Sequence, residues 1–263
     1  MSENLTRCAA LCSFRRMPRM RLPHPETLVV IGGLLLIAVV FLSVSPRNPP
    51  GFYRDESSIA YNAATLAAHG RDEYGARFPM FIKSFGDYKS PVYVYLLAGV
   101  FTITGPSKEV ARTFSAVLGL GAILTLFGLA FLATRKKLLS LAVALGAGLS
   151  PWIFEVTRLT FEVALEPLLI ALLLLVLYRA SAERWRPRAA IAVGVLLGLI
   201  AYTYQAGKVL AVLYALALAV FYGRRQLRGV AIAVGVFLTM LAALIPYNAK
   251  HPGGLTTRFN TVG

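Results

Sequence analysis

Residues 52–62, "FYRDESSIAYN", place Arg54, Asp55 and Glu56 side by side just after the first long apolar stretch. Carboxylates are the residue types that exchange protons in general acid–base catalysis. A simpler alternative is that Asp55 caps a helix predicted over residues 56–69, which Gly70 would end. A cap explains Asp55 but not its charged neighbours, so this segment is the first candidate for a functional site.

A second charged group lies in residues 150–167, "SPWIFEVTRLTFEVALEP". Glu155, Arg158, Glu162 and Glu166 are spaced by 3, 4 and 4 positions, which predicts a polar stripe on one face of a single helix. Ionisable side chains that enter a membrane are costly, and they usually face a cavity or a polar partner. The alternative is a ladder of salt bridges within the stripe itself.

The composition sets the class of protein. Hydrophobic residues make up 57% of the 263 residues and charged residues 15%, whereas a soluble domain has about a quarter charged residues. Seven stretches reach or approach the length that crosses a bilayer as a helix. We therefore predict an all-α, polytopic membrane protein with about seven transmembrane helices. The stretches are residues 27–45, 114–134, 138–154, 159–178, 189–206, 207–222 and 229–247.

The net charge of +15 has a distribution that indicates a membrane protein rather than a nucleic-acid-binding one. Ten Lys and Arg residues lie in three short loops, at 135–137, 179–188 and 223–228. Such clusters mark the cytoplasmic side of a membrane. We place these loops and a basic tail at 1–26 in the cytoplasm, with the membrane domain at 27–247 in the cell (inner or plasma) membrane.

One further apolar run, residues 91–105, decides the topology. Its fifteen residues are short for a membrane span. If it crossed, the ten basic residues would face outward and the four in the other loops inward. We therefore predict an interfacial helix, with Tyr93 and Tyr95 at headgroup level. The first extracytoplasmic loop is then large, residues 46–113, and residues 248–263 form another outer loop. Most acidic residues fall outside, which places the active face there.

Four segments together carry a resemblance to a known family. They are "FYRDESSIAYNA", "GDYKSPVYVYLLAGVFTITG", "VARTFSAVLG" and "SPWIFEVTRLTFEVALEP". In order and spacing the chain resembles membrane glycosyltransferases of the GT-C fold, of the family 39 and family 83 type. That group includes protein O-mannosyltransferases, aminoarabinose transferases and Rgt-like enzymes. The resemblance covers roughly residues 28–262, the amino-terminal membrane half of such enzymes, so we expect this chain to be an incomplete fragment of one.

The resemblance implies a reaction and roles for particular residues. The donor would be a sugar on a polyprenyl phosphate, and the acceptor a hydroxyl on a protein, lipid or glycan. Of the acidic pair Asp55 and Glu56, one would act as the catalytic base of an inverting transfer. Lys89 matches a family lysine at the donor phosphate, and Arg158 is the second choice for that role. The alternative for Lys89 is a lysine that snorkels to the membrane interface.

Two further expectations concern cofactors and a rival function. In aminoarabinose-transferase relatives an acidic residue that can ligate a metal directly precedes the lysine; here that place is Tyr88, with Asp87 before it. A divalent metal held by Asp87 and His251 is not supported by their spacing, so we expect no metal or other cofactor. The rival is a transporter or flippase-like protein that uses the charged stripe as a substrate path. The large outer loop and the lack of an inverted repeat favour the enzyme.

Overall fold

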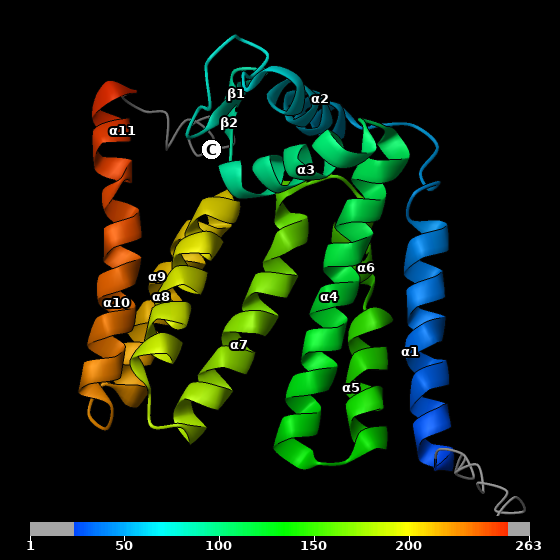
Figure 1. The fold of residues 1–263 in the computed structure, drawn as a ribbon, viewed down its shortest axis with the longest axis vertical. Coiled ribbons are helices and arrows are strands. Elements are labelled where there is room, and N and C mark those ends of the chain that lie inside the picture. Colours follow the sequence, from blue (N-terminus) through cyan, green and yellow to red (C-terminus); the bar gives the residue numbers. More distant parts are fainter. Residues whose placement is uncertain (1–23, 252–263) are drawn as a thin grey trace, which may run out of the picture.

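The computed structural model describes residues 24–251, whose regular elements are helices and one small hairpin joined by irregular segments (Figure 1). Most of the predicted cytoplasmic tail (1–26) and outer loop (248–263) lies outside the described residues. The elements in chain order are α1 Pro25–Val44, α2 Arg54–His69, β1 Ile82–Ser84, β2 Asp87–Lys89, α3 Pro91–Thr104, α4 Lys108–Thr134, α5 Lys137–Gly148, α6 Pro151–Arg158, the 3-10 turn η1 Glu162–Leu165, α7 Glu166–Ala182, α8 Pro187–Thr203, α9 Gln205–Tyr222, α10 Leu227–Ala242 and α11 Leu244–Lys250.

The long helices agree with the predicted polytopic membrane fold. Among the described residues, five segments are long and apolar enough to cross a bilayer. The pair α5 and α6 forms a sixth segment if its 60° bend is allowed. Helix α8 is a shorter apolar helix of 17 residues that packs against α7, α9 and α10. The five are Pro25–Val44, Lys108–Thr134, Glu162–Ala182, Gln205–Tyr222 and Leu227–Lys250.

The apolar stretch predicted at 138–154 is not one continuous helix but the bent pair of α5 and the first half of α6. Helix α5 ends at Gly148, and Pro151 begins α6 in a new direction. Proline lacks the N–H that would continue the backbone bonds of α5, but it fits the first turn of a new helix.

Helices α2 and α3 lie across one end of the long helices (Figure 1). This placement of α3 agrees with the prediction that residues 91–105 do not cross the membrane. The predicted headgroup position of Tyr93 is wrong, because its side chain is fully buried and bonds the hydroxyl of Ser115 on α4. Tyr95 is half-buried and donates to the carbonyl of Pro79.

Helix α2 begins one residue before Asp55. The N-cap residue is Tyr53, so the simple interpretation of Asp55 as the cap is wrong. Gly70 ends the helix as predicted, with a φ of 64° that glycine adopts without steric cost. Asp55 therefore lies in the first turn of α2, where its side chain is not required to close the helix.

The hairpin of β1 and β2 delivers Lys89 to the same end of the bundle. Ile82 pairs with Lys89 and Ser84 with Asp87, which leaves a two-residue turn at Phe85 and Gly86. Both turn residues have positive φ, 49° and 81°, as tight hairpins require. Lys89 is the last residue of β2, and Pro91 begins α3 two positions later.

A shared apolar core fixes α2 and α3 on the long helices. Burial of these side chains removes apolar surface from water, which is the main force that holds the crossing helices in place. The buried residues that meet there include Ile59, Leu66, Val94, Leu97, Leu165 and Leu197.

Candidate functional site

An ion pair between Asp55 and Lys89 lies at the end of the bundle that α2 and α3 cover. Lys89 Nζ is 2.7 Å from Asp55 Oδ1. The lysine side chain is 4% exposed, whereas the aspartate side chain is 51% exposed. A buried ammonium is stable where a carboxylate neutralises it. The structure thus brings together two residues that the sequence singled out separately.

The pair faces a small cavity of about 220 Å³. One wall comes from α2 and the end of β2. The rest of the lining comes from the break between α6 and α7 and from the junction of α8 and α9. The lining residues are Asp55, Ile59, Lys89, Phe161, Glu162, Val163 and Tyr204. Charged and aromatic side chains beside an apolar wall are typical of ligand sites.

Tyr204 was missed by the sequence analysis. It stands in extended conformation between α8 and α9, at a break that the sequence placed between residues 206 and 207. The polar residues of "YTYQ" at 202–205 interrupt an otherwise apolar run, and this interruption could have predicted the break.

Glu56 has a different environment from Asp55. It is fully buried, and Arg112 of α4 donates to both of its carboxylate oxygens, at 3.0 Å from Nε and 2.8 Å from Nη2. The backbone N–H groups of Tyr53 and Thr160 add bonds of 3.0 Å and 2.9 Å. Burial by itself raises the pKa of Glu56, but these bonds outweigh it and lower the pKa below its ordinary value of 4.5. Glu56 is therefore an ionised carboxylate that is saturated with protein donors.

The predicted polar stripe does not form. Glu155 and Arg158 belong to α6, whereas Glu162 lies in η1 and Glu166 begins α7. Leu159 and Phe161 between them have extended backbones, so no helix runs through the four residues. The expectation of one shared helix face is wrong, because Pro167 favours a new helix start and the chain turns before it.

The four residues do not form one network: Glu155 and Arg158 pair with each other, and Glu162 and Glu166 have other surroundings. Glu155 and Arg158 form a partly exposed pair, with 2.6 Å between the closest atoms. Arg158 also donates to the carbonyl of Asn48 at 3.3 Å, and it does not line the cavity beside Lys89. Glu162 accepts the backbone N–H of Ser90.

Glu166 is buried beside α9. Within the described residues, its Oε1 has no hydrogen-bond partner. A side chain at Gly207 would come within 2.7 Å of that oxygen, so the glycine allows α9 to approach it.

The alternative of a metal held by Asp87 and His251 stays untested. The side chain of Asp87 lies outside what the structure describes. The His251 ring stacks on Tyr247 with 4.6 Å between ring centroids.

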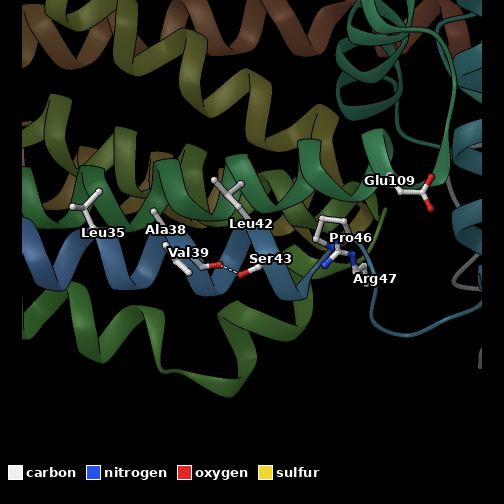
Figure 2. A pocket seen from close by; sticks show the side chains of 8 residues that line it. All are labelled: Leu35, Ala38, Val39, Leu42, Ser43, Pro46, Arg47 and Glu109. Atoms are coloured by element: carbon white, nitrogen blue, oxygen red, sulfur yellow. Dashed lines mark hydrogen bonds between the residues drawn. The ribbon is translucent and has the colours of Figure 1, made fainter.

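A second, larger groove of about 580 Å³ runs along α1 and shares no residue with the cavity at Lys89 (Figure 2). Its floor is apolar, and Arg47 and Glu109 lie at its loop end (Figure 2). An apolar groove on a helix of this length is suited to contact with lipid chains. The lining residues are Leu35, Ala38, Val39, Leu42, Ser43, Pro46, Arg47 and Glu109.

Comparison with known families identifies this arrangement. The family model described as dolichyl-phosphate-mannose-protein mannosyltransferase matches residues 88–248, more than half of the chain. The chain belongs to this mannosyltransferase family. The matched part includes Lys89, Arg158 and Tyr204, and it begins after Asp55 and Glu56. No curated protein sequence matches the chain.

A solved structure has the same fold. It is the crystal structure of ArnT from Cupriavidus metallidurans bound to undecaprenyl phosphate, with a TM-score of 0.50 and 17% sequence identity. The match covers 88% of this chain but 43% of ArnT, so the chain spans less than half the length of that protein. The family match and this likeness together show the GT-C fold of membrane glycosyltransferases.

Proposed function

We propose that this glycosyltransferase moves a sugar from a polyprenyl-phosphate donor to a hydroxyl of a protein, lipid or glycan. The family name specifies dolichyl-phosphate mannose, and the solved ArnT structure holds undecaprenyl phosphate. Both are long-chain lipid phosphates, which supports a donor of this class. The observation that carries the proposal is the Asp55–Lys89 pair beside a cavity at the covered end of the bundle.

The chemistry divides between the two residues. The acceptor oxygen attacks the anomeric carbon as the bond from that carbon to the phosphate oxygen breaks, and the lipid phosphate leaves with the electron pair. Asp55 takes the proton of the attacking hydroxyl. Lys89 stabilises the negative charge that grows on the departing phosphate. A single displacement of this kind inverts the configuration at the anomeric carbon.

Asp55 fits the base better than Glu56. Asp55 is half exposed and adjoins the cavity, so a hydroxyl can approach it. Glu56 is fully buried and already accepts bonds from Arg112, Tyr53 and Thr160. We therefore give the proton transfer to Asp55 and treat Glu56 as a support for the first turn of α2.

Lys89 likewise fits the phosphate better than Arg158. Its ammonium faces the cavity next to the base, whereas Arg158 is engaged by Glu155 and by the carbonyl of Asn48. A lysine that snorkels would extend its amine into water, but that of Lys89 is turned inward onto Asp55.

The active face we propose is extracytoplasmic. The connections α4–α5, α7–α8 and α9–α10 lie at the end opposite α2 and α3 (Figure 1), and they hold the clusters of Lys and Arg. Short basic loops stay in the cytoplasm. The cavity beside Lys89 then opens on the outer side of the cell membrane.

The test is a transfer assay in membranes that contain the full chain. Polyprenyl phosphates that carry different labelled sugars are supplied one at a time, and lipid, glycan and protein fractions are scored for label. We expect at least one sugar to be transferred by the wild-type chain and lost in Asp55→Asn. Absence of transfer from every donor, with the protein present at normal levels, would contradict the proposal and favour the transporter.

A further inference from the structure

The buried carboxylate of Glu56 joins three segments of the chain: the start of α2, α4 and the break between α6 and η1. Its partners are Arg112 in α4, the N–H of Tyr53 just before α2 and the N–H of Thr160 in the break between α6 and η1. Arg112 and Glu56 both have side chains that are 0% exposed. We call Glu56 and Arg112 the buried clamp.

The buried clamp connects two of the segments that line the Asp55–Lys89 cavity. Glu56 lies in the first turn of α2, next to Asp55. Its bond to Thr160 fixes the residue just before Phe161 and Glu162, which line the cavity. A shift of either segment relative to the other would change the position of Asp55 with respect to Phe161 and Glu162.

Arg112 also fixes the loop that enters α2. Its guanidinium donates to the carbonyls of Pro49 and Gly51, and its Cζ lies 5.2 Å from the centre of the Phe52 ring. Lys108, one turn earlier on α4, donates to the intervening carbonyl of Pro50 at 3.0 Å. The guanidinium makes four hydrogen bonds within the protein and its side chain is 0% exposed, which gives Arg112 a positioning role rather than contact with substrate.

A buried ion pair stabilises a fold little in net free energy, because desolvation of the two charges offsets their attraction. Two charges lose their hydration when they are buried, and an apolar pair of similar volume often stabilises a fold as well or better. What the charged pair adds is a defined geometry, since a guanidinium and a carboxylate meet in one planar arrangement. That geometry acts on the residues on both sides of the cavity.

We propose that the buried clamp of Glu56 and Arg112 positions Asp55 against Lys89, so that the base is set by residues that never touch substrate. This inference rests on the proposed function for its catalytic consequence. Its structural part, the effect of the clamp on the Asp55–Lys89 pair, does not require transfer to occur.

The structural part is tested by chemical labelling of Lys89. The full chain in nanodiscs is treated briefly with acetic anhydride, and acetylation of Lys89 is quantified by mass spectrometry. The Lys89 amine is buried and bonded to Asp55, so the reagent reaches it slowly while the pair is intact. We expect Arg112→Lys, which keeps the charge but loses the fork, to raise labelling about fivefold or more, towards the level of Asp55→Asn.

Lys108→Gln is the matched control. Lys108 lies on the same helix and contacts the same loop, but it has no bond to Glu56. We expect Lys89 to be acetylated to the same extent in the Lys108→Gln variant as in the wild type. Equal labelling in wild type, Arg112→Lys and Lys108→Gln, with higher labelling in Asp55→Asn, would overturn the proposal. No increase even in Asp55→Asn would also overturn it, since there would be no pair to position.

A second variant guards against loss of folding. Glu56→Gln combined with Arg112→Gln removes both charges together and leaves no unpaired charge inside the protein. Folding is checked by a single symmetric peak in size-exclusion chromatography. We expect this folded double variant to label Lys89 faster than the wild type, and unchanged labelling would contradict the proposal.

The catalytic part is tested by separating turnover from donor affinity. With a donor that the wild type uses, Arg112→Lys should lower kcat about tenfold or more while the dissociation constant of the donor stays within about twofold. Equal loss in Lys108→Gln would show general loosening of the loop and would overturn the positioning role. If no donor is ever transferred, the proposed function fails while the labelling result still stands.

Discussion

Lys89 Nζ lies 2.7 Å from the carboxylate of Asp55, although the two residues are 34 positions apart in the chain. The hairpin β1–β2 brings the lysine beneath the first turn of α2, and the shared core holds α2 in place. In the function proposed above, this pair supplies the base and the cation of the transfer.

Replacement of the lysine is expected to act on turnover. Lys89→Gln removes a charge contact to a phosphate that becomes more negative as the glycosidic bond breaks, so kcat should fall by about 10² with a smaller loss of donor affinity. Initial rates against donor concentration, in nanodiscs, separate the two effects.

Arg158→Gln is the comparison for that experiment. Since Arg158 pairs with Glu155 at a partly exposed position, we expect turnover to stay within about fivefold of wild type. A large kcat loss in Arg158→Gln with none in Lys89→Gln would reverse our choice of phosphate ligand.

The stability of the protein should depend on acid pH through Glu56. Its folded pKa lies below the ordinary 4.5, because bonds from Arg112, Thr160 and Tyr53 outweigh the opposing effect of burial. The stabilisation is therefore complete above pH 4.5 and is lost as the pH falls through the lowered value. Thermal unfolding between pH 7 and pH 3 should show a steeper decline in wild type than in the double variant Glu56→Gln with Arg112→Gln.

Removal of one member of that pair tests the same interaction at neutral pH. Arg112→Met leaves a buried carboxylate without its counter-ion, which should lower the free energy of unfolding by roughly 3–5 kcal/mol. An unfolding temperature equal to that of wild type would mean that Glu56 finds another partner.

The orientation of the bundle follows from its basic loops. A reporter fused after Lys137 should be cytoplasmic, and one inserted after Gly75, in the segment between α2 and β1, should be external. If the Lys137 reporter were external, the cavity beside Lys89 would face the cytoplasm, and the supply of donor would have to come from that side.

The apolar stretches and the basic loops were sufficient to predict the membrane fold. They also predicted that α3 does not run parallel to the long helices, and it lies across their end (Figure 1). Both signals are sums over many residues, so a few exceptions do not hide them. The resemblance also singled out Asp55 and Lys89. Their mutual contact could not be predicted, because it depends on a hairpin of two three-residue strands and on how α2 is packed.

The region between α6 and α7 is where sequence reasoning failed. Spacing of 3, 4 and 4 made Glu155 to Glu166 look like one helical stripe, yet the backbone is extended at Leu159 and Phe161. Tertiary bonds outweigh local periodicity there: Glu56 takes the N–H of Thr160, and Glu162 takes that of Ser90. Such partners lie about a hundred residues away or on another element, so no local pattern reveals them.

The most direct test of the account is the rate of Asp55→Asn at saturating donor and acceptor. Asparagine has nearly the same size and shape as aspartate but does not accept the proton. We predict normal levels of folded protein, donor binding like that of wild type, and initial transfer rates lowered by about 10² or more, the range expected for loss of a general base. A folded Asp55→Asn protein that transfers sugar at the wild-type rate would contradict the assignment of the base and, with it, the catalytic role of the Asp55–Lys89 pair.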